Sequence, residues 1–135
     1  MTFLTAGTRL VSLDYIAGFF DGEGSVVVRF VRDGRYRAGY RVSTKVVFVQ
    51  KERDVLEEIH ETLGMGHLYR RGSDGVWYLE IYRREDLREF VELIGNRTMV
   101  KRDALERLAT VLELLEGGVH GSRDGLERIR EVWEG

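Results

Sequence analysis

The chain contains no cysteine and no proline among its 135 residues. It also has no run of about 18 apolar residues, which is the length that a membrane-spanning helix requires. The N-terminus has no basic stretch followed by an apolar one, so no targeting signal is predicted. We therefore expect an intracellular protein that has no disulfides and no membrane partner, and the absence of cysteine agrees with that compartment.

Neither sign of charge dominates, because 21 Lys and Arg against 23 Asp and Glu give a formal net charge of −2. Charged residues make up 33% and hydrophobic residues 43%, a globular composition that excludes disordered, collagenous and disulfide-scaffold proteins. The length predicts a single domain over residues 1–135, in which residues 117–135 form a linker and a C-terminal helix. A slightly acidic total argues, at first sight, against a nucleic-acid partner.

The distribution of charge along the chain reverses that first interpretation. Residues 25–51 carry seven basic residues against the single acid Asp33, a local charge of +6, and residues 67–84 carry +2. The remaining segments are acidic. The positive charge is therefore confined to two stretches.

Hydrophobic periodicity predicts what those two stretches form. Helices are expected near residues 13–20, 52–63, 87–94, 105–115 and 123–134, and strands near residues 26–31, 40–49, 67–71 and 76–82. Both basic stretches thus fall in predicted hairpins, whereas the helices are acidic.

Side chains alternate between the two faces of each predicted strand. Arg41, Ser43 and Lys45 share one face, and Val42, Val46 and Phe48 share the other. In the second hairpin, Trp77, Leu79 and Ile81 face the core while Tyr78, Glu80 and Tyr82 lie opposite. A cationic sheet face suits the major groove of DNA, but a solvated face whose Arg and Lys protect the sheet edge has the same pattern. Charge alone does not decide between the two.

A motif at residues 16–24, Ile-Ala-Gly-Phe-Phe-Asp-Gly-Glu-Gly, favours the DNA interpretation. It ends an apolar helix and precedes a β-branched strand. We expect Ala17 and Gly18 to allow two helix backbones to approach, and Gly22 and Gly24 to let the chain turn out of the helix without a Cβ penalty. The nine residues resemble the LAGLIDADG motif of homing endonucleases at every position.

The resemblance implies an α+β fold, the αββαββα arrangement with a four-stranded antiparallel DNA-binding saddle, here with extra C-terminal helices. It implies Mg²⁺-dependent cleavage of double-stranded DNA, with Mn²⁺ able to substitute and Ca²⁺ supporting binding without cleavage. Glu23 and the carbonyl of Gly22 would hold the metal, a hard ion that prefers oxygen ligands. Gln50 would orient water, and Lys101 would polarise the nucleophile or stabilise charge on the phosphate.

A single copy of the motif implies a homodimer that is isologous across the motif helices and reads a long pseudo-palindromic site. Such an intron-encoded mobile-element enzyme would cut across the minor groove and leave short 3′ overhangs. The expected dimer contacts are Leu13, Ala17, Gly18 and Phe20. The expected DNA contacts are Arg29, Arg35, Arg37, Arg41, Ser43, Lys45, Tyr69, Arg71, Tyr78, Glu80 and Tyr82.

Other interpretations remain open at this point. Glu23, Gln50 and Lys101 could be ordinary surface residues, and the first motif acid, Asp21, is kept out of the catalytic set because it is often structural in the family. A LAGLIDADG-type RNA maturase or an inactive DNA-binding regulator would keep the fold, although the presence of Glu23 favours the nuclease. An interaction domain with a charged sheet is the alternative without nucleic acid, and its affinity for DNA would not fall steeply with salt.

Overall fold

The computed structural model describes residues 10–135. Its elements are α1 (Leu13–Glu23), β1 (Gly24–Arg32), β2 (Tyr40–Gln50), α2 (Arg53–Leu63), β3 (His67–Arg70), β4 (Trp77–Ile81), α3 (Arg84–Ile94), α4 (Arg102–Glu116) and α5 (Arg123–Glu134). The predicted order of elements is confirmed, and two short 3₁₀ turns at Gly95–Arg97 and Val119–Gly121 were not predicted. The expectation about an N-terminal targeting signal concerns residues that lie mostly outside the described part.

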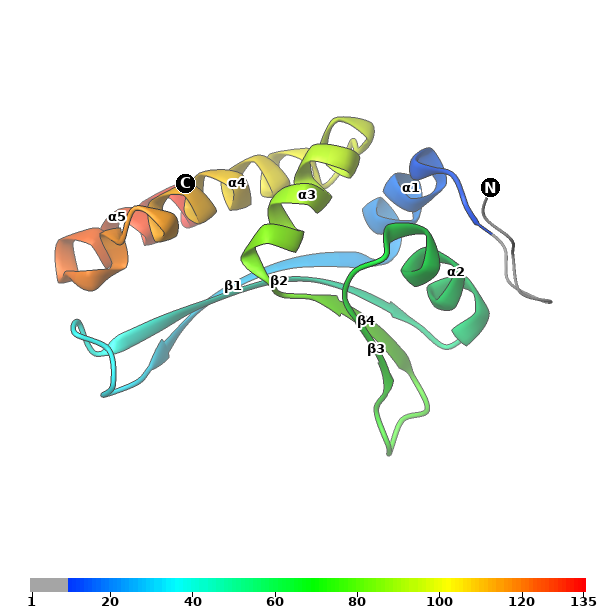
Figure 1. Ribbon diagram of the computed structural model, residues 1–135, viewed down its shortest axis with the longest axis horizontal. Coiled ribbons are helices and arrows are strands. Elements are labelled where there is room, and N and C mark those ends of the chain that lie inside the picture. Colours follow the sequence, from blue (N-terminus) through cyan, green and yellow to red (C-terminus); the bar gives the residue numbers. More distant parts are fainter. Residues whose placement is uncertain (1–9) are drawn as a thin grey trace.

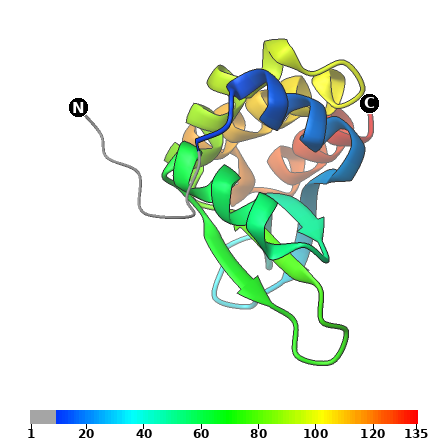
Figure 2. The ribbon, with the colours of Figure 1, turned by 90° about the vertical axis from the view of Figure 1, so that its right-hand side faces the viewer.

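The four strands form one antiparallel sheet in the order β1-β2-β4-β3. All the helices lie on one side of this sheet, and its other side is open and arched (Figures 1 and 2). The α+β class and the four-stranded saddle are therefore confirmed. Over residues 10–135, no helix has the length and apolarity needed to cross a membrane.

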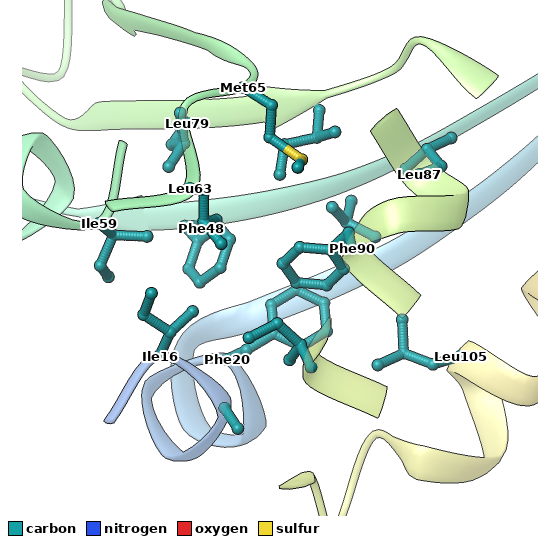
Figure 3. Close-up of a cluster of buried hydrophobic side chains, with 14 of the residues drawn as sticks. Ile16, Phe20, Phe48, Ile59, Leu63, Met65, Leu79, Leu87, Phe90 and Leu105 are labelled. Atoms are coloured by element: carbon teal, nitrogen blue, oxygen red, sulfur yellow. The ribbon is translucent and has the colours of Figure 1, made fainter. Parts of the chain in front are cut away.

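The sheet and helices are joined by a core in which three phenylalanine rings meet (Figure 3). The ring of Phe20 in α1 lies 5.1 Å from Phe48 in β2 and 5.2 Å from Phe90 in α3, measured between centroids. All three side chains are fully buried. Since a pair of such rings contributes about 0.5–1.5 kcal/mol beyond the burial of their area, this contact fixes α1 and α3 over the sheet.

A second apolar cluster lies under the C-terminal helices. Val42 in β2 packs there with Val111 and Leu115 of α4 and with Leu126 and Ile129 of α5. In Figure 1, α4 and α5 cover the part of the sheet formed by the β1–β2 hairpin. The C-terminal helix therefore supports that hairpin from behind.

The motif requires a glycine at position 24 for a different reason from the one predicted. Gly22 and Gly24 do not have positive φ, so neither turn requires a glycine backbone conformation. A Cβ on Gly24, however, would lie 2.1 Å from the ring of Phe20. Gly24 is thus required because the buried ring packs directly against its backbone.

The register of the sheet defines its open face, the side away from the helices. Residues paired across an antiparallel ladder point to the same side. Arg29 is opposite Ser43, Val27 is opposite Lys45, and Glu80 is opposite both Val47 and His67. The open face comprises Ser25, Val27, Arg29, Val31, Arg41, Ser43, Lys45, Val47, Val49, Tyr78, Glu80, His67 and Tyr69. The predicted alternation of basic and apolar residues in β2 is confirmed, because Val42, Val46 and Phe48 are buried on the helix side.

Candidate catalytic end and nucleic-acid interface

The first acid of the motif is occupied by contacts within the chain. The carboxylate of Asp21 accepts hydrogen bonds from the backbone N–H of Met99 at 2.8 Å and of Lys101 at 3.0 Å. Burial raises the pKa of Asp21, but these backbone hydrogen bonds and the charge of Lys101 outweigh it, so the pKa lies below its usual value. Asp21 therefore fixes the segment before α4 against the end of α1.

The second acid, Glu23, is in the opposite situation. Its side chain is exposed at the last residue of α1, and within residues 10–135 no hydrogen bond or ion pair engages it. It lines a hollow of about 310 Å³ together with Gln50 and Lys51 at the end of β2, and with Val49 and Val76. The structure thus brings two of the three predicted catalytic residues together, along with Lys51, which was not predicted.

The orientation of the Gln50 amide follows from its neighbours. Its Oε1 accepts from the backbone N–H of Lys51 at 2.8 Å and of Glu52 at 3.3 Å. These N–H groups belong to the two residues directly before α2. Because the oxygen is used in this way, Gln50 presents its NH₂ group, a donor, to the surroundings.

Lys101 is held from the side of Asp21 and does not line the hollow of Glu23. Its Nζ donates to the Asp21 carbonyl at 3.0 Å, while its backbone N–H donates to the Asp21 carboxylate. Both ends of the lysine are therefore attached to a residue two positions before Glu23. Asp21 is visible in the sequence as the first acid of the motif. Its partner Lys101, however, lies about 80 residues further along the chain, so the sequence alone does not indicate this contact.

The donor set at this end suits a hard cation. Glu23 supplies a carboxylate, and Gly22 supplies a carbonyl among the last four of α1, which have no partner within the helix. Within the described part of the chain, no group of three or more His, Cys, Asp or Glu side chains gathers as a metal site.

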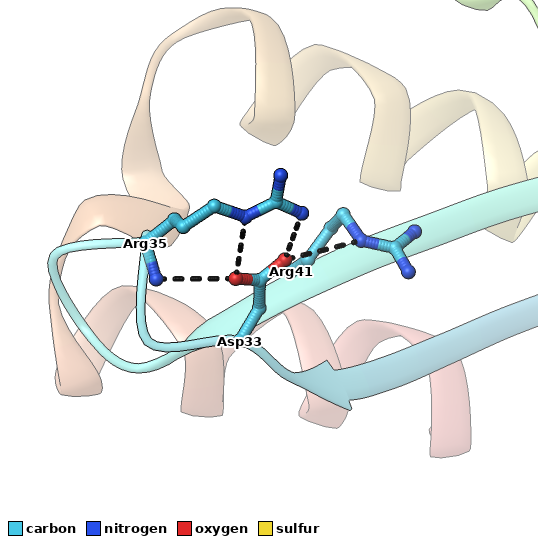
Figure 4. A network of polar contacts seen from close by, with 3 residues as sticks. All are labelled: Asp33, Arg35 and Arg41. Atoms are coloured by element: carbon cyan, nitrogen blue, oxygen red, sulfur yellow. Dashed lines mark hydrogen bonds and ion pairs between the residues drawn. The ribbon is translucent and has the colours of Figure 1, made fainter.

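The tip of the β1–β2 hairpin is organised by one acid (Figure 4). Asp33 accepts from Arg35 Nε at 3.0 Å and Nη2 at 2.8 Å, and its Oδ2 lies 3.8 Å from Arg41 Nε. The hydrogen bonds and charge of Arg35 lower the pKa of Asp33 to about 2. Of the predicted DNA contacts in this hairpin, Arg29, Arg41, Ser43 and Lys45 lie on the open face. Arg37 instead borders the α4–α5 connection, and Arg35 lies in the tip.

The β3–β4 half of the open face is aromatic. Tyr69 stacks on His67 at 5.5 Å and on Tyr78 at 5.4 Å between centroids, and the guanidinium of Arg71 lies 4.7 Å from the Tyr78 ring. Tyr82 follows the end of β4 and is exposed. Three of the predicted DNA contacts, Tyr69, Arg71 and Tyr78, thus lie against one another. Their stacking was not predicted.

The predicted dimer contacts require a correction. Ala17 and Phe20 are fully buried inside the protomer, because the α1 face that carries them packs on Phe48 and Phe90, so neither is available to a partner. Leu13 is half-buried against the same core. Gly18 alone of the four is exposed, and a Cβ built on it would have no heavy atom within 4 Å.

Two exposed apolar side chains beside α1 were missed by the sequence analysis. Met99 and Val100 are 83% and 72% exposed, in the turn that Asp21 fixes. Tyr15 of α1 is also exposed. Their only sequence signal is an apolar pair placed directly before Lys101 and outside any predicted helix.

A helix that ends in a free acid above an arched, cationic sheet defines a domain of the homing endonuclease type. The family model described as LAGLIDADG endonuclease matches residues 16–104. The chain belongs to the LAGLIDADG endonuclease family, and the resemblance noted in the motif is confirmed.

Named relatives agree with this assignment. Homing endonuclease I-ApeI of Aeropyrum pernix is 30% identical over 102 residues, which are 76% of this chain and 43% of that protein. The chain thus spans less than half the length of this relative. The crystal structure of the homing endonuclease I-TnaI has a TM-score of 0.83 at 29% identity, covering 93% of this chain and 87% of that one. The archaeal intron-encoded homing endonuclease I-Vdi141I, complexed with DNA, has a TM-score of 0.81 at 25% identity, covering 90% and 79%.

Proposed function

We propose that this protein is a site-specific homing endonuclease that hydrolyses both strands of a long pseudo-palindromic DNA site. The observation that carries the proposal is the pair of motif acids: Asp21 is held by backbone N–H groups, and Glu23, two residues later, has an exposed carboxylate beside Gln50. A carboxylate at an exposed helix end, in a domain whose open sheet face carries Arg29, Arg41 and Lys45, is suited to phosphodiester chemistry. The DNA-bound structure of the relative I-Vdi141I supports double-stranded DNA as the substrate.

Glu23 and the carbonyl of Gly22 would hold a divalent ion, Mg²⁺ under physiological conditions. When bound, such an ion lowers the pKa of a coordinated water and neutralises charge on the phosphate. Mn²⁺ also fits oxygen donors of this kind, and Ca²⁺, which is larger and less strict in geometry, would support binding without cleavage.

The other two residues of this end would act on the phosphate and on water. Gln50 presents NH₂ donors, since its oxygen is bonded to the start of α2, so it would donate to a water or a phosphate oxygen. Lys101, held on the Asp21 carbonyl, would place a positive charge beside the phosphate as negative charge develops. Asp21 is a positioning residue for that lysine.

The protein would act as a homodimer, because one motif provides one acid and two strands must be cut. The exposed side of α1 carries Gly18 and Gly22, four residues apart, and a Cβ on either would meet nothing within 4 Å in its own protomer. Two helices could approach closely along that line, with Met99 and Val100 of each copy covered by the other. This arrangement would bring two Glu23 carboxylates to opposite strands across the minor groove, leaving short 3′ overhangs.

The open face would lie in the major groove. Arg29, Arg41 and Lys45 on β1 and β2 supply positive charge there, while the acidic helices are on the far side of the sheet (Figure 1). Phosphate contacts of this kind make affinity fall steeply with salt, with a slope of about −0.9 per contact on logarithmic axes. A charged interaction domain with no DNA target would lack that slope.

The direct test is a cleavage selection on a DNA library in Mg²⁺, with the ends of the products mapped. We expect cuts at one sequence with a fixed stagger and short 3′ overhangs, and no products from Glu23→Gln. The matched control is Glu92→Gln, which removes an exposed acid on α3, away from the end of α1. Equal cleavage by Glu23→Gln and the control would overturn the assignment, and RNA-specific binding would favour the maturase alternative.

A further inference from the structure

The centre of the open face contains an acid where a surface that binds phosphate would be expected to carry none. Glu80 of β4 lies between Val47 of β2 and His67 of β3 in the sheet register. Its carboxylate is held by two specific donors, Lys45 from β2 and Tyr69 from β3. This arrangement calls for an explanation in terms of what the face recognises.

Each oxygen of Glu80 has its own donor. Oε1 accepts from Lys45 Nζ at 3.2 Å, and Oε2 accepts from the hydroxyl of Tyr69. The side chains of Glu80 and Lys45 are 17% and 30% exposed, so the group remains in contact with the surroundings. Burial raises the pKa of Glu80, but the Tyr69 and Lys45 contacts outweigh it and leave the pKa below its usual value. The hydrogen bond from Tyr69 raises the pKa of that phenol to about 12, so it stays a neutral donor.

The side chains around Glu80 cannot easily turn away. Tyr69 stacks on the rings of both His67 and Tyr78, and the guanidinium of Arg71 lies over the ring of Tyr78. The acid is therefore fixed in one orientation by a network that spans β2, β3 and β4. A polar network whose members are hydrogen-bonded to one another specifies one arrangement of its groups, so Glu80 presents its remaining acceptor positions in a defined direction.

The chemistry of the fixed group is that of an acceptor. An ionised carboxylate offers about four lone-pair directions, of which Lys45 and Tyr69 use two, and it offers no proton. In the major groove the groups that donate are the exocyclic amines of adenine and cytosine, whereas guanine and thymine present acceptors at the corresponding positions. A phosphate would be repelled from this point of the face.

We propose that Glu80 is a specificity-determining residue that selects a base with an exocyclic amine, adenine or cytosine, at one position of each half-site. Lys45 and Tyr69 are positioning residues that hold its carboxylate toward the groove. This inference rests on the proposed function, since it requires that the open face lie in the major groove of DNA. It adds to that function the class of base and the residue that recognises it. It also predicts that Glu80 increases discrimination between sequences while it lowers the affinity for DNA in general.

The test compares wild type with Glu80→Gln by selection of bound duplexes from a randomised library in Ca²⁺, so that no DNA is cut. We expect Glu80→Gln to lose about tenfold or more of its preference at one position per half-site, which is adenine or cytosine in the wild-type profile. We also expect its affinity for random duplexes to rise, because a negative charge has been removed from the face. The control Glu92→Gln should leave both quantities unchanged.

A second measurement changes the DNA and compares wild type with Glu80→Gln on each altered duplex. The selected site is synthesised with each amine-bearing base replaced in turn by an analogue that lacks the amine, and wild type is bound to each duplex. One replacement per half-site should weaken binding by wild type and leave Glu80→Gln unaffected. A uniform loss at all positions in Glu80→Gln would show a merely structural role and overturn the proposal. Wild type that binds all duplexes equally, without a steep salt dependence, would instead overturn the proposed function and this inference with it.

Discussion

The end of α1 and the open face of the sheet use their charged side chains in different ways. At the helix end, Asp21 is held entirely by the chain, while Glu23 has no partner within residues 10–135. On the face, Lys45 and Glu80 hold each other, and Arg29 remains exposed beside them. The difference indicates a division of labour: the helix end would perform the cleavage, and the face would choose the sequence.

The largest expected effect is on DNA cleavage and concerns Glu23 at the end of α1. If each protomer supplies the acid for one strand, a mixed dimer of wild type and Glu23→Gln should nick one strand and leave the other intact. The homodimeric variant should lose cleavage by at least about a hundredfold, since the carboxylate that would hold the divalent ion is removed. Supercoiled plasmid carrying the site measures both, because nicked and linear forms separate on a gel. Linear product from the mixed dimer at the wild-type rate would contradict the assignment of one acid to each strand.

The next prediction concerns the exposed side of α1. Gly18→Leu should give a monomer that binds DNA weakly and does not cleave it, because the side chain would occupy the space through which a second helix approaches. The protomer itself should fold, since leucine favours a helix over glycine by up to about 1 kcal/mol. Sedimentation measures the oligomeric state, and circular dichroism measures whether the protomer is folded. Gly34→Leu is the matched control, because a Cβ there also meets nothing within 4 Å but lies in the β1–β2 turn. A dimeric, active Gly18→Leu would exclude this face as the interface.

Asp21 and Asp14, both on α1, should differ in how much they contribute to the free energy of unfolding. Asp21→Asn should lower the free energy of unfolding by about 1–3 kcal/mol, because two backbone N–H groups lose a charged acceptor. Asp14→Asn should cost less than about 1 kcal/mol, because Asp14 is 79% exposed and pairs with an exposed Arg97. Urea denaturation measures both. Equal losses would show that the contacts of Asp21 do not hold the segment before α4.

The smallest expected effect concerns the hairpin tip and its dependence on pH. The pKa of Asp33 is about 2 in the fold against a usual value of 3.8, so its stabilising contribution is fully present above about pH 5 and is lost as the pH falls through 3.8 toward 2. The difference in melting temperature between wild type and Asp33→Asn should therefore be constant above pH 5 and shrink below pH 4. A difference that does not change between pH 5 and pH 2.5 would contradict the ion pair with Arg35.

Much of the fold could be predicted from the sequence because its elements follow simple periodicities. The alternation in β2 correctly separates Arg41 and Lys45 from Val42 and Phe48, and the stripe of Leu56, Ile59 and Leu63 defines α2. Helix α1 is apolar nearly all round, so its sequence does not say which side meets the sheet. For that reason the sequence predicts a dimer contact for Phe20 and Ala17, whereas the structure buries both in the core.

The site could be predicted only where its residues lie next to recognisable local patterns. The family resemblance implies Glu23 through the motif and Gln50 through its place at the end of the second strand, and both line the same hollow. The partners of Asp21 lie about 80 residues away, and the Lys45–Glu80 contact depends on how β2 pairs with β4, so neither could be inferred from local spacing. The total charge of −2 was misleading for the same reason, because the sum does not record that the basic residues share one face.

The central claim is that cleavage depends on the end of α1 and sequence recognition depends on the open face of the sheet. Parallel measurement of binding and cleavage on one selected duplex tests this claim most directly. Affinity is measured in Ca²⁺ and single-turnover cleavage in Mg²⁺, for wild type, Glu23→Gln and Glu80→Gln. We predict that Glu23→Gln binds with wild-type affinity and does not cleave. Glu80→Gln should cleave the DNA that it binds at close to the wild-type rate, while accepting altered bases at one position per half-site. Loss of binding and cleavage in the same proportion in both variants would contradict the separation.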